Sequence, residues 1–450
     1  MAQTELGRTT FDVIIIGGGP AGAETAIEAA ARGLKTLVIT EMPAGGRATY
    51  GSLLPSKAWL HAAEERNHGA DGGGRDTGEL PDLAPLRTHI QELQKARTAQ
   101  LTENMKARGV EVVAGTARFI KRNTVRLRGE DGSVDISGKN IVVTAGSEPR
   151  FFPKVKPDGE RMIAPRHTQK LQELPKRMIM VGGGVTGCEY ATAFRKMGAE
   201  VTLITDIDRL LPRTDPELAA LLQKRMEALG ISFVFNSPIK SVENQGSEVL
   251  TTTADGTEYR TDYTFIATGR RPDDSFLEEA EEHPARTDGG WLQADAAGRT
   301  SLEGVYAAGD IAGPPLTANN AHTMARRIVR DILGERQSSQ APTLIEAVYT
   351  EPQVVHIGPA LELSAGLSGV KEHRVRYADT LLGRIHGDED ALLKIWVDEE
   401  SAAIRGAAAF GENAVDILAP VQLAMEHGVS YRDLRGTPLA HPALSEVLTM

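Results

Sequence analysis

The sequence is poor in cysteine: Cys188 is the one cysteine among its 450 residues. No disulfide can form within a single chain, so chemistry that needs two thiols of the same chain is excluded. Aromatic residues are also scarce, at 5%. No apolar run approaches the roughly 18 residues that a membrane helix needs, and we therefore expect no membrane insertion.

Positive charge is in the minority, with 50 Lys and Arg residues against 61 Asp and Glu, a formal net charge of −11. Nucleic acid repels a chain of this sign, so we expect no nucleic-acid partner. The opening residues, MAQTELGRTT, lack the apolar stretch of a secretory signal, which predicts a cytoplasmic protein. The chain is too long for a single core, and we expect about three domains.

A glycine-rich turn near the start of the chain predicts a nucleotide-binding unit. Gly17, Gly19 and Gly22 follow an apolar, β-branched run and precede an alanine-rich stretch. This spacing allows a sharp turn, close approach of a pyrophosphate and tight packing of the helix on the strand. The predicted order is a strand at Phe11–Ile16, a helix at Ala21–Arg32 and a strand at Thr36–Ile39.

The same pattern recurs in the second quarter of the chain. Gly182, Gly184 and Gly187 lie between a predicted strand at Arg177–Val181 and a predicted helix at Cys188–Met197. A duplicated nucleotide-binding unit is far more specific than a single glycine motif. We therefore predict two dinucleotide sites in one chain.

The second strand of each unit ends with equivalent residues. Thr40 is followed by Glu41, and Thr205 is followed by Asp206. An acidic residue usually holds the ribose hydroxyl pair at this place. Either the acid or the threonine hydroxyl could make that contact, and both choices stay open.

Other segments predict the sheets around these units. Runs at Val110–Ala114, Ala117–Ile120, Thr124–Arg128 and Val134–Ile136 predict a small antiparallel meander that leads into the strand and turn IVVTAG (141–146). A second meander is predicted around 231–263, before the strand and turn FIATGRRP (265–272). The glycine-rich stretch HGADGGGRDTGELP (68–81) predicts a surface loop.

A late strand, GVYAAGDIAG (304–313), ends in a carboxylate, Asp310. Together with the two glycine units and the two ATG-like turns, it resembles the pyridine nucleotide-disulfide oxidoreductase family, typified by dihydrolipoamide dehydrogenase. The resemblance implies an α/β fold with two Rossmann-like dinucleotide-binding domains, for FAD and NAD(P), and a C-terminal α+β domain that builds a homodimer. The implied segments are an FAD-binding domain at 1–150 and 273–340, an NAD(P)-binding domain at 151–272 and an interface domain at 341–450.

The resemblance also implies the roles of single residues. It places FAD on the first unit, with Gly46 and Gly146 in the flanking turns and Asp310 at the ribityl chain, and a nicotinamide nucleotide on the second unit, with Gly269 in its turn. The lysine of the family motif P-S-K lies at Lys57, and its partner acid at Glu189. A buried cation beside flavin N5 needs such a paired carboxylate and can stabilise negative charge on the reduced ring.

The sequence departs from the family where the redox disulfide lies. The family motif G-G-T-C-x-N-x-G-C-x-P-S-K reads here GGRATYGSLLPSK (45–57), with Ala48 and Leu53 at the cysteine positions. Neither residue can attack sulfur, and Cys188 is expected to be a small buried residue of the second nucleotide-binding helix. Disulfide reduction by the usual route is therefore excluded.

The C-terminal motif keeps an acid–base pair without its thiols. His441 and Glu446 match the family's H-P-x-x-S-E, in which the histidine moves protons across the dimer interface. His441 could protonate another acceptor, such as a quinone oxygen, or it could remain as a dimer contact. Both interpretations stay open.

These observations predict an FAD-dependent NAD(P)H oxidoreductase that passes electrons to a small acceptor other than a disulfide, most simply a quinone. Ala48, Leu53 and Tyr50 would line an apolar wall for such an acceptor, and the chain most resembles the NAD(P)H:quinone reductase branch. A soluble transhydrogenase and a non-catalytic redox sensor are the alternatives. Gly187 and Asp206 favour NADH over NADPH, although Arg209 could attract a 2′-phosphate. No metal site is expected.

Overall fold

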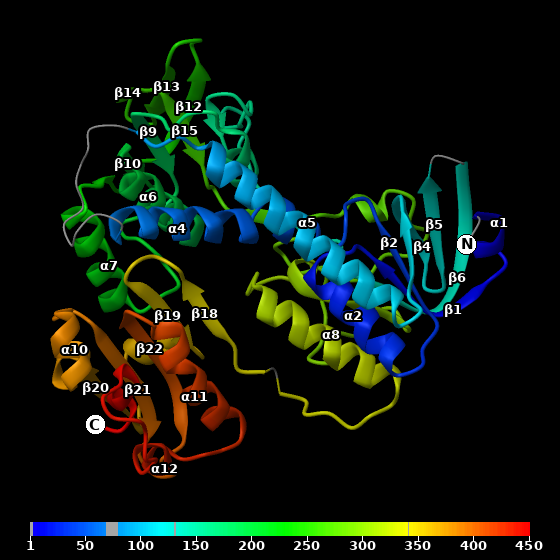
Figure 1. Cartoon of the computed structure of the whole chain (residues 1–450). Helices are drawn as coiled ribbons and strands as arrows, with labels where there is room; N and C mark the ends of the chain where they lie inside the picture. Colours follow the sequence, from blue (N-terminus) through cyan, green and yellow to red (C-terminus); the bar gives the residue numbers. More distant parts are fainter. Residues whose placement is uncertain (1–2, 69–79, 130–131, 341) are drawn as a thin grey trace. The chain divides into compact units, whose positions relative to one another are not determined.

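The structure is a computed structural model that describes residues 3–68, 80–129, 132–340 and 342–450 (Figure 1). The chain divides into two compact units. Unit 1 comprises residues 1–55, 88–150 and 269–341, and unit 2 comprises residues 56–87, 151–268 and 342–450. Of the stretch predicted as a surface loop, residues 69–79 lie outside the described part of the chain.

A mainly parallel sheet forms the centre of unit 1. Its strand order is β3-β2-β1-β6-β5-β4, and β17 pairs in parallel with β6. Central strands such as β1 are buried apolar runs, as expected for a sheet that is covered on both faces. The strands are β1 (Thr10–Ile16), β2 (Thr36–Thr40), β3 (Glu111–Ala114), β4 (Thr116–Lys121), β5 (Thr124–Gly129), β6 (Gly132–Val143) and β17 (Val305–Ala307).

Two predictions for this sheet were wrong. The run at 110–114 was predicted to begin the antiparallel meander, but β3 pairs in parallel with β2. The runs at 134–136 and 141–143 were predicted as separate strands, but β6 includes both and ends at Val143. Its amino-terminal half pairs with β5 and its carboxyl-terminal half with β1 and β17, so the polar residues Gly138–Asn140 mark a change of neighbour and not a break.

Helices pack on this sheet, and a separate pair of short strands lies outside it. In Figure 1, α2 and α8 lie side by side, and α2 is alanine-rich with a proline in its first turn. The helices are α1 (Gln3–Leu6), α2 (Pro20–Ala31), α3 (Gly46–Tyr50) and α8 (Ala318–Ile332), with 3₁₀ turns η2 (Ser275–Leu277) and η3 (Gly309–Ala312). Outside the main sheet, β7 (Ser147–Pro149) pairs antiparallel with β16 (Arg270–Pro272). Two long helices, α4 (Leu53–His68) and α5 (Ala84–Lys106), run across the boundary between the units in sequence.

The nucleotide-binding half of unit 2 repeats the architecture. A parallel sheet has the order β11-β10-β9-β15-β8, and a separate antiparallel sheet contains β12, β13 and β14. The start of the predicted meander around 231–263 was therefore wrong, since β11 belongs to the parallel sheet. The strand predicted at FIATGRRP corresponds to β15. The elements are η1 (Pro165–Lys170), β8 (Met162–Ile163), β9 (Arg177–Val181), α6 (Val185–Met197), β10 (Glu200–Ile204), α7 (Pro216–Ala228), β11 (Ser232–Val234), β12 (Ile239–Asn244), β13 (Val249–Thr253), β14 (Glu258–Thr261) and β15 (Tyr263–Ile266).

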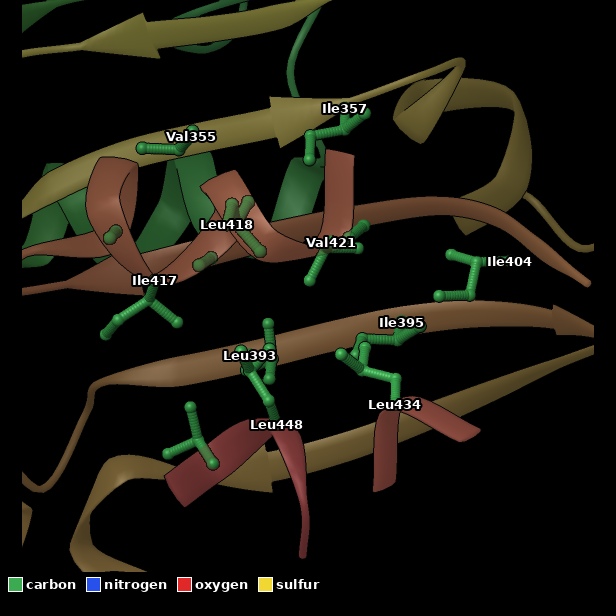
Figure 2. Close-up of a cluster of buried hydrophobic side chains, with 14 of the residues drawn as sticks. Val355, Ile357, Leu393, Ile395, Ile404, Ile417, Leu418, Val421, Leu434 and Leu448 are labelled. Atoms are coloured by element: carbon green, nitrogen blue, oxygen red, sulfur yellow. The ribbon is translucent and has the colours of Figure 1, made fainter. Parts of the chain in front are cut away.

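The C-terminal part of unit 2 is an antiparallel sheet with helices. The strand order is β18-β19-β22-β21-β20, and α11 packs on β19 and β22. Figure 2 shows its buried cluster, to which α11 contributes Ile417, Leu418 and Val421. The elements are β18 (Ile345–Val348), β19 (Gln353–Ile357), α9 (Ala360–Ser364), β20 (Val370–Arg376), η4 (Tyr377–Asp379), α10 (Leu381–His386), β21 (Leu392–Asp398), β22 (Ile404–Gly411), α11 (Ala414–Glu426), α12 (Tyr431–Arg435) and η5 (Leu444–Leu448). No helix in the described residues is long and apolar enough to span a membrane.

Candidate functional site

The first glycine-rich turn has the geometry of a phosphate cradle. Gly17 has φ +107°, and a Cβ on it would press against the carbonyl oxygen of Thr144. A Cβ on Gly22 would overlap the Gly17 carbonyl, so α2 packs directly against the turn. Gly19 caps α2 and would have no atom within 4 Å of an added Cβ. This helix end is therefore open to an anion.

Other residues predicted to serve FAD gather around the same turn. A Cβ on Gly46 would lie 3.0 Å from the Cα of Gly19, and a Cβ on Gly309 would lie 3.1 Å from the Cβ of Ala21 in α2. Asp310 follows Gly309 in η3. The glycine turn, the Gly46 segment and the Asp310 carboxylate therefore meet at the carboxyl ends of the parallel strands, where α/β sheets bind ligands.

The Asp310 carboxylate already has polar partners within unit 1. It accepts a hydrogen bond from the hydroxyl of Ser147, and Nε of Arg270 lies 3.6 Å from its Oδ2. Burial lowers the pKa of Arg270, and the charge of Asp310 opposes that shift. Gly146 precedes Ser147 with φ +79° and open space around it. Asp310 is thus a fixed acceptor, which suits a sugar-like hydroxyl chain.

The two candidate ribose contacts at the end of β2 differ in exposure and in hydrogen bonding. The hydroxyl of Thr40 donates to the carbonyl of Met42 at 2.7 Å, so its hydrogen is used by the chain itself. Glu41 is exposed. The carboxylate is the group that can accept from both hydroxyls of a ribose.

Arg47 is a residue of this region that the sequence reasoning missed. Its guanidinium donates to the Ser147 carbonyl at 2.9 Å and to Oδ2 of Asp273 at 2.7 Å, with Glu148 at 3.6 Å. It therefore joins α3 to the β7–β16 pair. The available signal in the sequence was an arginine at the family's threonine position, next to Ala48. That signal did not indicate which residues Arg47 would contact.

The second glycine-rich turn repeats the first almost residue for residue. Gly182 has φ +110°, and a Cβ added to it would press against the carbonyl oxygen of Ala267. A Cβ on Gly187 would overlap the Gly182 carbonyl, and Gly184 caps α6 with no atom within 4 Å of an added Cβ. The structure thus provides a second open helix end for a phosphate.

The strand end beside this turn holds the predicted ribose contacts. Thr205 is buried and Asp206 is exposed. The guanidinium of Arg209 donates to the carbonyl of Pro212 at 2.7 Å, which engages one of its nitrogens locally. Gly269, predicted for this site, has φ +96° and begins the last segment of unit 1, where its carbonyl accepts from the amide of Arg150.

Lys57 and Glu189 form an ion pair in unit 2. The Lys57 ammonium donates to Oε1 of Glu189 at 2.7 Å, and the two side chains are 31% and 6% exposed. The helices that carry them, α4 and α6, are held together by Trp59 and Phe194, whose ring centroids lie 4.9 Å apart. Burial lowers the pKa of Lys57, while the charge and hydrogen bond of Glu189 oppose that shift.

Tyr349 completes this pair, and the sequence reasoning did not assign it a role. Its amide donates to the same Oε1 of Glu189 at 3.0 Å, and its ring centroid lies 4.1 Å from the Lys57 nitrogen. The segment YTEPQV was singled out as a family-like motif, but a motif does not say which side chain its aromatic ring covers.

The residues at the cysteine positions carry no reactive group. Ala48 is half-buried in α3, and Leu53 is 45% exposed at the start of α4. The hydroxyl of Tyr50 lies 2.7 Å from that of Thr98 on α5, so this side chain is fixed by a polar contact. Cys188 is fully buried, and burial raises the pKa of its thiol, which makes it inert.

The C-terminal pair is oriented as an acid–base dyad. Nδ1 of His441 lies 2.8 Å from Oε1 of Glu446, and Oε2 accepts from the Ala443 amide at 3.0 Å. That amide, followed by His441, lowers the pKa of Glu446. Because an ionised carboxylate only accepts, Nδ1 carries the hydrogen and Nε2 is the free basic nitrogen. His441 is 67% exposed.

The predicted catalytic residues form two separate pairs, Lys57 with Glu189 and His441 with Glu446. In unit 2, no hydrogen bond or ion pair between described residues joins the His441–Glu446 dyad to the Lys57–Glu189 pair. A cavity of about 570 Å³ in the C-terminal part is lined by His373, Tyr431 and other residues, none of them predicted site residues. Among the described side chains, no cluster of three metal-ligating groups occurs.

Known sequences match the chain over its whole length. The family model described as pyridine nucleotide-disulphide oxidoreductase matches residues 11–325, and the model of the family's dimerisation domain matches residues 345–450. The dihydrolipoyl dehydrogenase of Thermus scotoductus is 32% identical over 98% of this chain and 96% of its own length. That of Chlorobaculum tepidum is 31% identical over 100% and 97%.

Solved structures match the fold. The crystal structure of LpdA from Mycobacterium tuberculosis superposes with a TM-score of 0.89, 26% identity and 98% coverage of both chains. The HOCl-induced flavoprotein disulfide reductase RclA from Escherichia coli, in its Cu(II) complex, gives a TM-score of 0.85 at 23% identity, again with 98% coverage of both chains. The predicted fold class is therefore confirmed.

Proposed function

Because the chain belongs to the pyridine nucleotide-disulphide oxidoreductase family, we propose that it carries electrons from NADH through FAD to a small acceptor that is not a disulfide, in particular a quinone. The observation that carries the proposal is a contrast within one motif. Ala48 and Leu53 stand at the two thiol positions, whereas Lys57 keeps its ion pair with Glu189. The curated relatives are named dihydrolipoyl dehydrogenases, so the acceptor is the point at which this chain would differ.

FAD, when bound, supplies a two-electron carrier between the nicotinamide and the acceptor. The residues proposed to hold it are the open turn around Gly19, the neighbouring Gly46, and Asp310 for the hydroxyl chain. Glu41 is proposed for the adenosine ribose, because Thr40 uses its hydroxyl hydrogen within the chain. The first glycine turn supports its proposed role, because a Cβ would fit neither at Gly17 nor at Gly22.

Lys57 and His441 are proposed to have distinct electrostatic tasks. With FAD bound, a charged Lys57 would favour the reduced, negatively charged flavin. His441, held through Nδ1 by Glu446, presents Nε2 as the atom that gives a proton to the acceptor oxygen. The balance is one NADH and one proton consumed for each quinone reduced to a hydroquinone.

NADH is the proposed electron donor, and the active form is proposed to be a homodimer. Asp206, exposed at the end of β10, would repel a 2′-phosphate, and Arg209 already donates to the Pro212 carbonyl. The match of residues 345–450 to the family's dimerisation domain supports the dimer.

The test is an anaerobic titration of the purified yellow protein with NADH, and separately with NADPH. We expect NADH to bleach the absorbance at about 450 nm, where oxidised flavin absorbs, without a thiolate-to-flavin charge-transfer band. Reoxidation is then followed with a soluble quinone and, as the matched control, with lipoamide and glutathione disulfide. We expect the quinone to restore the colour and the disulfides to leave the flavin reduced.

Three results would contradict the proposal. Turnover of lipoamide would overturn the acceptor class, and faster reduction by NADPH than by NADH would overturn the donor. A protein that binds FAD but is reduced by neither nucleotide would be a sensor and not an oxidoreductase.

A further inference from the structure

Tyr349 touches both members of the ion pair. It is the first residue after β18, in the turn that leads to β19. Its amide and the Lys57 ammonium donate to the same oxygen of Glu189, at 3.0 and 2.7 Å. The ring lies over the ammonium, with 4.1 Å between the nitrogen and the ring centroid. This distance is well inside the range of a cation–π contact.

The turn that presents Tyr349 is fixed to α6. The carboxylate of Glu351 pairs with Lys196, and the buried Thr350 donates from its hydroxyl to the Pro352 carbonyl at 2.7 Å. Glu189 and Lys196 are seven residues apart on α6 and thus share one helix face. The turn therefore contacts this helix face twice, at Glu189 and at Lys196, and these contacts position the ring of Tyr349.

The Tyr349 ring contacts the Lys57 ammonium where burial disfavours its positive charge. Lys57 is withdrawn from water by more than half, and desolvation favours its neutral form. Glu189 opposes this through its charge, and the negative face of the tyrosine ring opposes it through the ring quadrupole. Asp416 of α11 adds negative charge on the Tyr349 side. The charge of Glu189 also acts on two buried titratable groups of α6, the Cys188 thiol and the Tyr190 hydroxyl.

We infer that Tyr349 is a positioning residue for Lys57: its ring holds the ammonium in place and in the charged form, and its amide fixes the partner carboxylate. The inference rests on the proposed function only for the task of Lys57 at the flavin. It gives the C-terminal part of the chain a role in the redox chemistry of its own subunit, in addition to dimerisation. Tyr349 itself contacts neither of the proposed acid–base groups.

The first experiment measures the titration of Lys57 directly. The FAD-loaded protein is acetylated at a series of pH values against a free-amine standard, and mass spectrometry gives the reactivity of Lys57. Tyr349→Leu removes the ring and keeps the amide, while Tyr349→Phe keeps both. We expect the midpoint for Lys57 to fall by about half a pH unit in Y349L and to stay unchanged in Y349F. Lys224, on an exposed pair with Asp390, is the internal control and should not shift.

The second experiment asks whether the charge matters to the flavin. Stopped-flow reduction by NADH should slow about fivefold in Y349L and stay near the wild-type rate in Y349F. A shifted Lys57 midpoint with an unchanged reduction rate would uphold the role of Tyr349 and refute the role that the proposed function gives to Lys57. An unshifted midpoint in Y349L, or an equal shift in Y349F, would overturn the inference itself.

A third variant covers the case in which Y349L does not fold. A trifluorinated phenylalanine at position 349 preserves the shape of the ring and weakens its quadrupole. A lowered Lys57 midpoint in that protein supports the inference, and a wild-type midpoint overturns it.

Discussion

Lys57 and Glu189 depend on each other for both charge and position. Glu189 is nearly inaccessible to water, and its hydrogen-bond donors in the described part of the chain are the Lys57 ammonium and the Tyr349 amide. Removing one charge from such a pair leaves the other desolvated and unpaired. The pair is therefore sensitive to single substitutions and tolerant of a matched double substitution.

We predict that Lys57→Met lowers the free energy of unfolding by about 2 kcal/mol, below the usual cost for a fully buried pair because Lys57 is partly exposed. Flavin reduction by NADH should slow about a hundredfold, since the charge that stabilises the reduced ring is lost. Chemical denaturation and anaerobic stopped-flow absorbance measure the two effects.

The matched control separates stability from catalysis. Lys57→Met combined with Glu189→Leu removes both charges and should recover most of the lost stability without recovering the rate. Lys224→Met, on an exposed pair, should change stability by less than about 0.5 kcal/mol. A double variant with the wild-type reduction rate would show that the pair is structural.

Sequence reasoning reached some of these residues and not others. Lys57 and Glu189 were predicted because each lies in a motif of fixed spacing, and the structure brings them together. Tyr349 and Arg47 received no role, because a ring over an ammonium and a guanidinium between two carboxylates are contacts between distant segments. No local pattern specifies such contacts.

At the level of elements, α3 is tied to the β7–β16 pair through Arg47 and Asp273. Burial alone would raise the pKa of Asp273, but hydrogen bonds from Arg47 and Ser275 outweigh it and lower that pKa below the usual value. A carboxyl whose pKa is lower in the folded state stabilises the protein above its unfolded pKa. That stability is lost as the pH falls through the folded pKa.

We therefore predict that Asp273→Asn flattens the acid limb of the stability curve. At pH 7 the variant should be less stable than the wild type by about 1 kcal/mol, because Arg47 loses its charged acceptor. The difference should shrink as the pH falls below about 4. Thermal unfolding at a series of pH values measures it, with the exposed Asp288→Asn as control. A constant difference at all pH values would contradict the assignment.

Helices and strands with strong local sequence patterns were predicted well, whereas the pairing of strands within the sheets was predicted less well. The two strand–glycine turn–helix units agree with β1–α2 and β9–α6 to within a few residues. The pairing of β3 and the unbroken course of β6 were wrong in the prediction. Alternation and propensity describe one strand at a time, whereas the neighbour of a strand is decided by the whole sheet.

At the scale of the whole molecule, the question is whether the acid–base dyad serves its own chain or its partner. His441 is largely exposed within one chain, and the dyad has no bond to the Lys57 pair among described residues. A group that acts across a twofold interface completes a site on the other subunit.

We predict that His441→Ala dimerises normally but loses quinone turnover, and that it complements Lys57→Met in mixed dimers. If His441 acts across the interface, a mixed dimer has one intact site, and an equal mixture after subunit exchange should recover about a quarter of wild-type turnover. Size-exclusion chromatography and the quinone assay measure the two properties. Exchange without recovered turnover would place His441 in its own subunit's site, and full turnover by His441→Ala alone would make the dyad structural.

The sequence by itself determined the family, the α/β class, the two glycine turns and the absence of a thiol pair. These depend on short segments and on counts of residue types, because a glycine turn needs its spacing and a disulfide needs two cysteines. Only the tertiary structure decided which groups surround the Lys57 ammonium and which acid the Arg47 guanidinium pairs with. Those contacts join residues more than a hundred positions apart in the chain, as with Lys57 and Glu189, 132 positions apart, and the folded packing alone brings them within bonding distance.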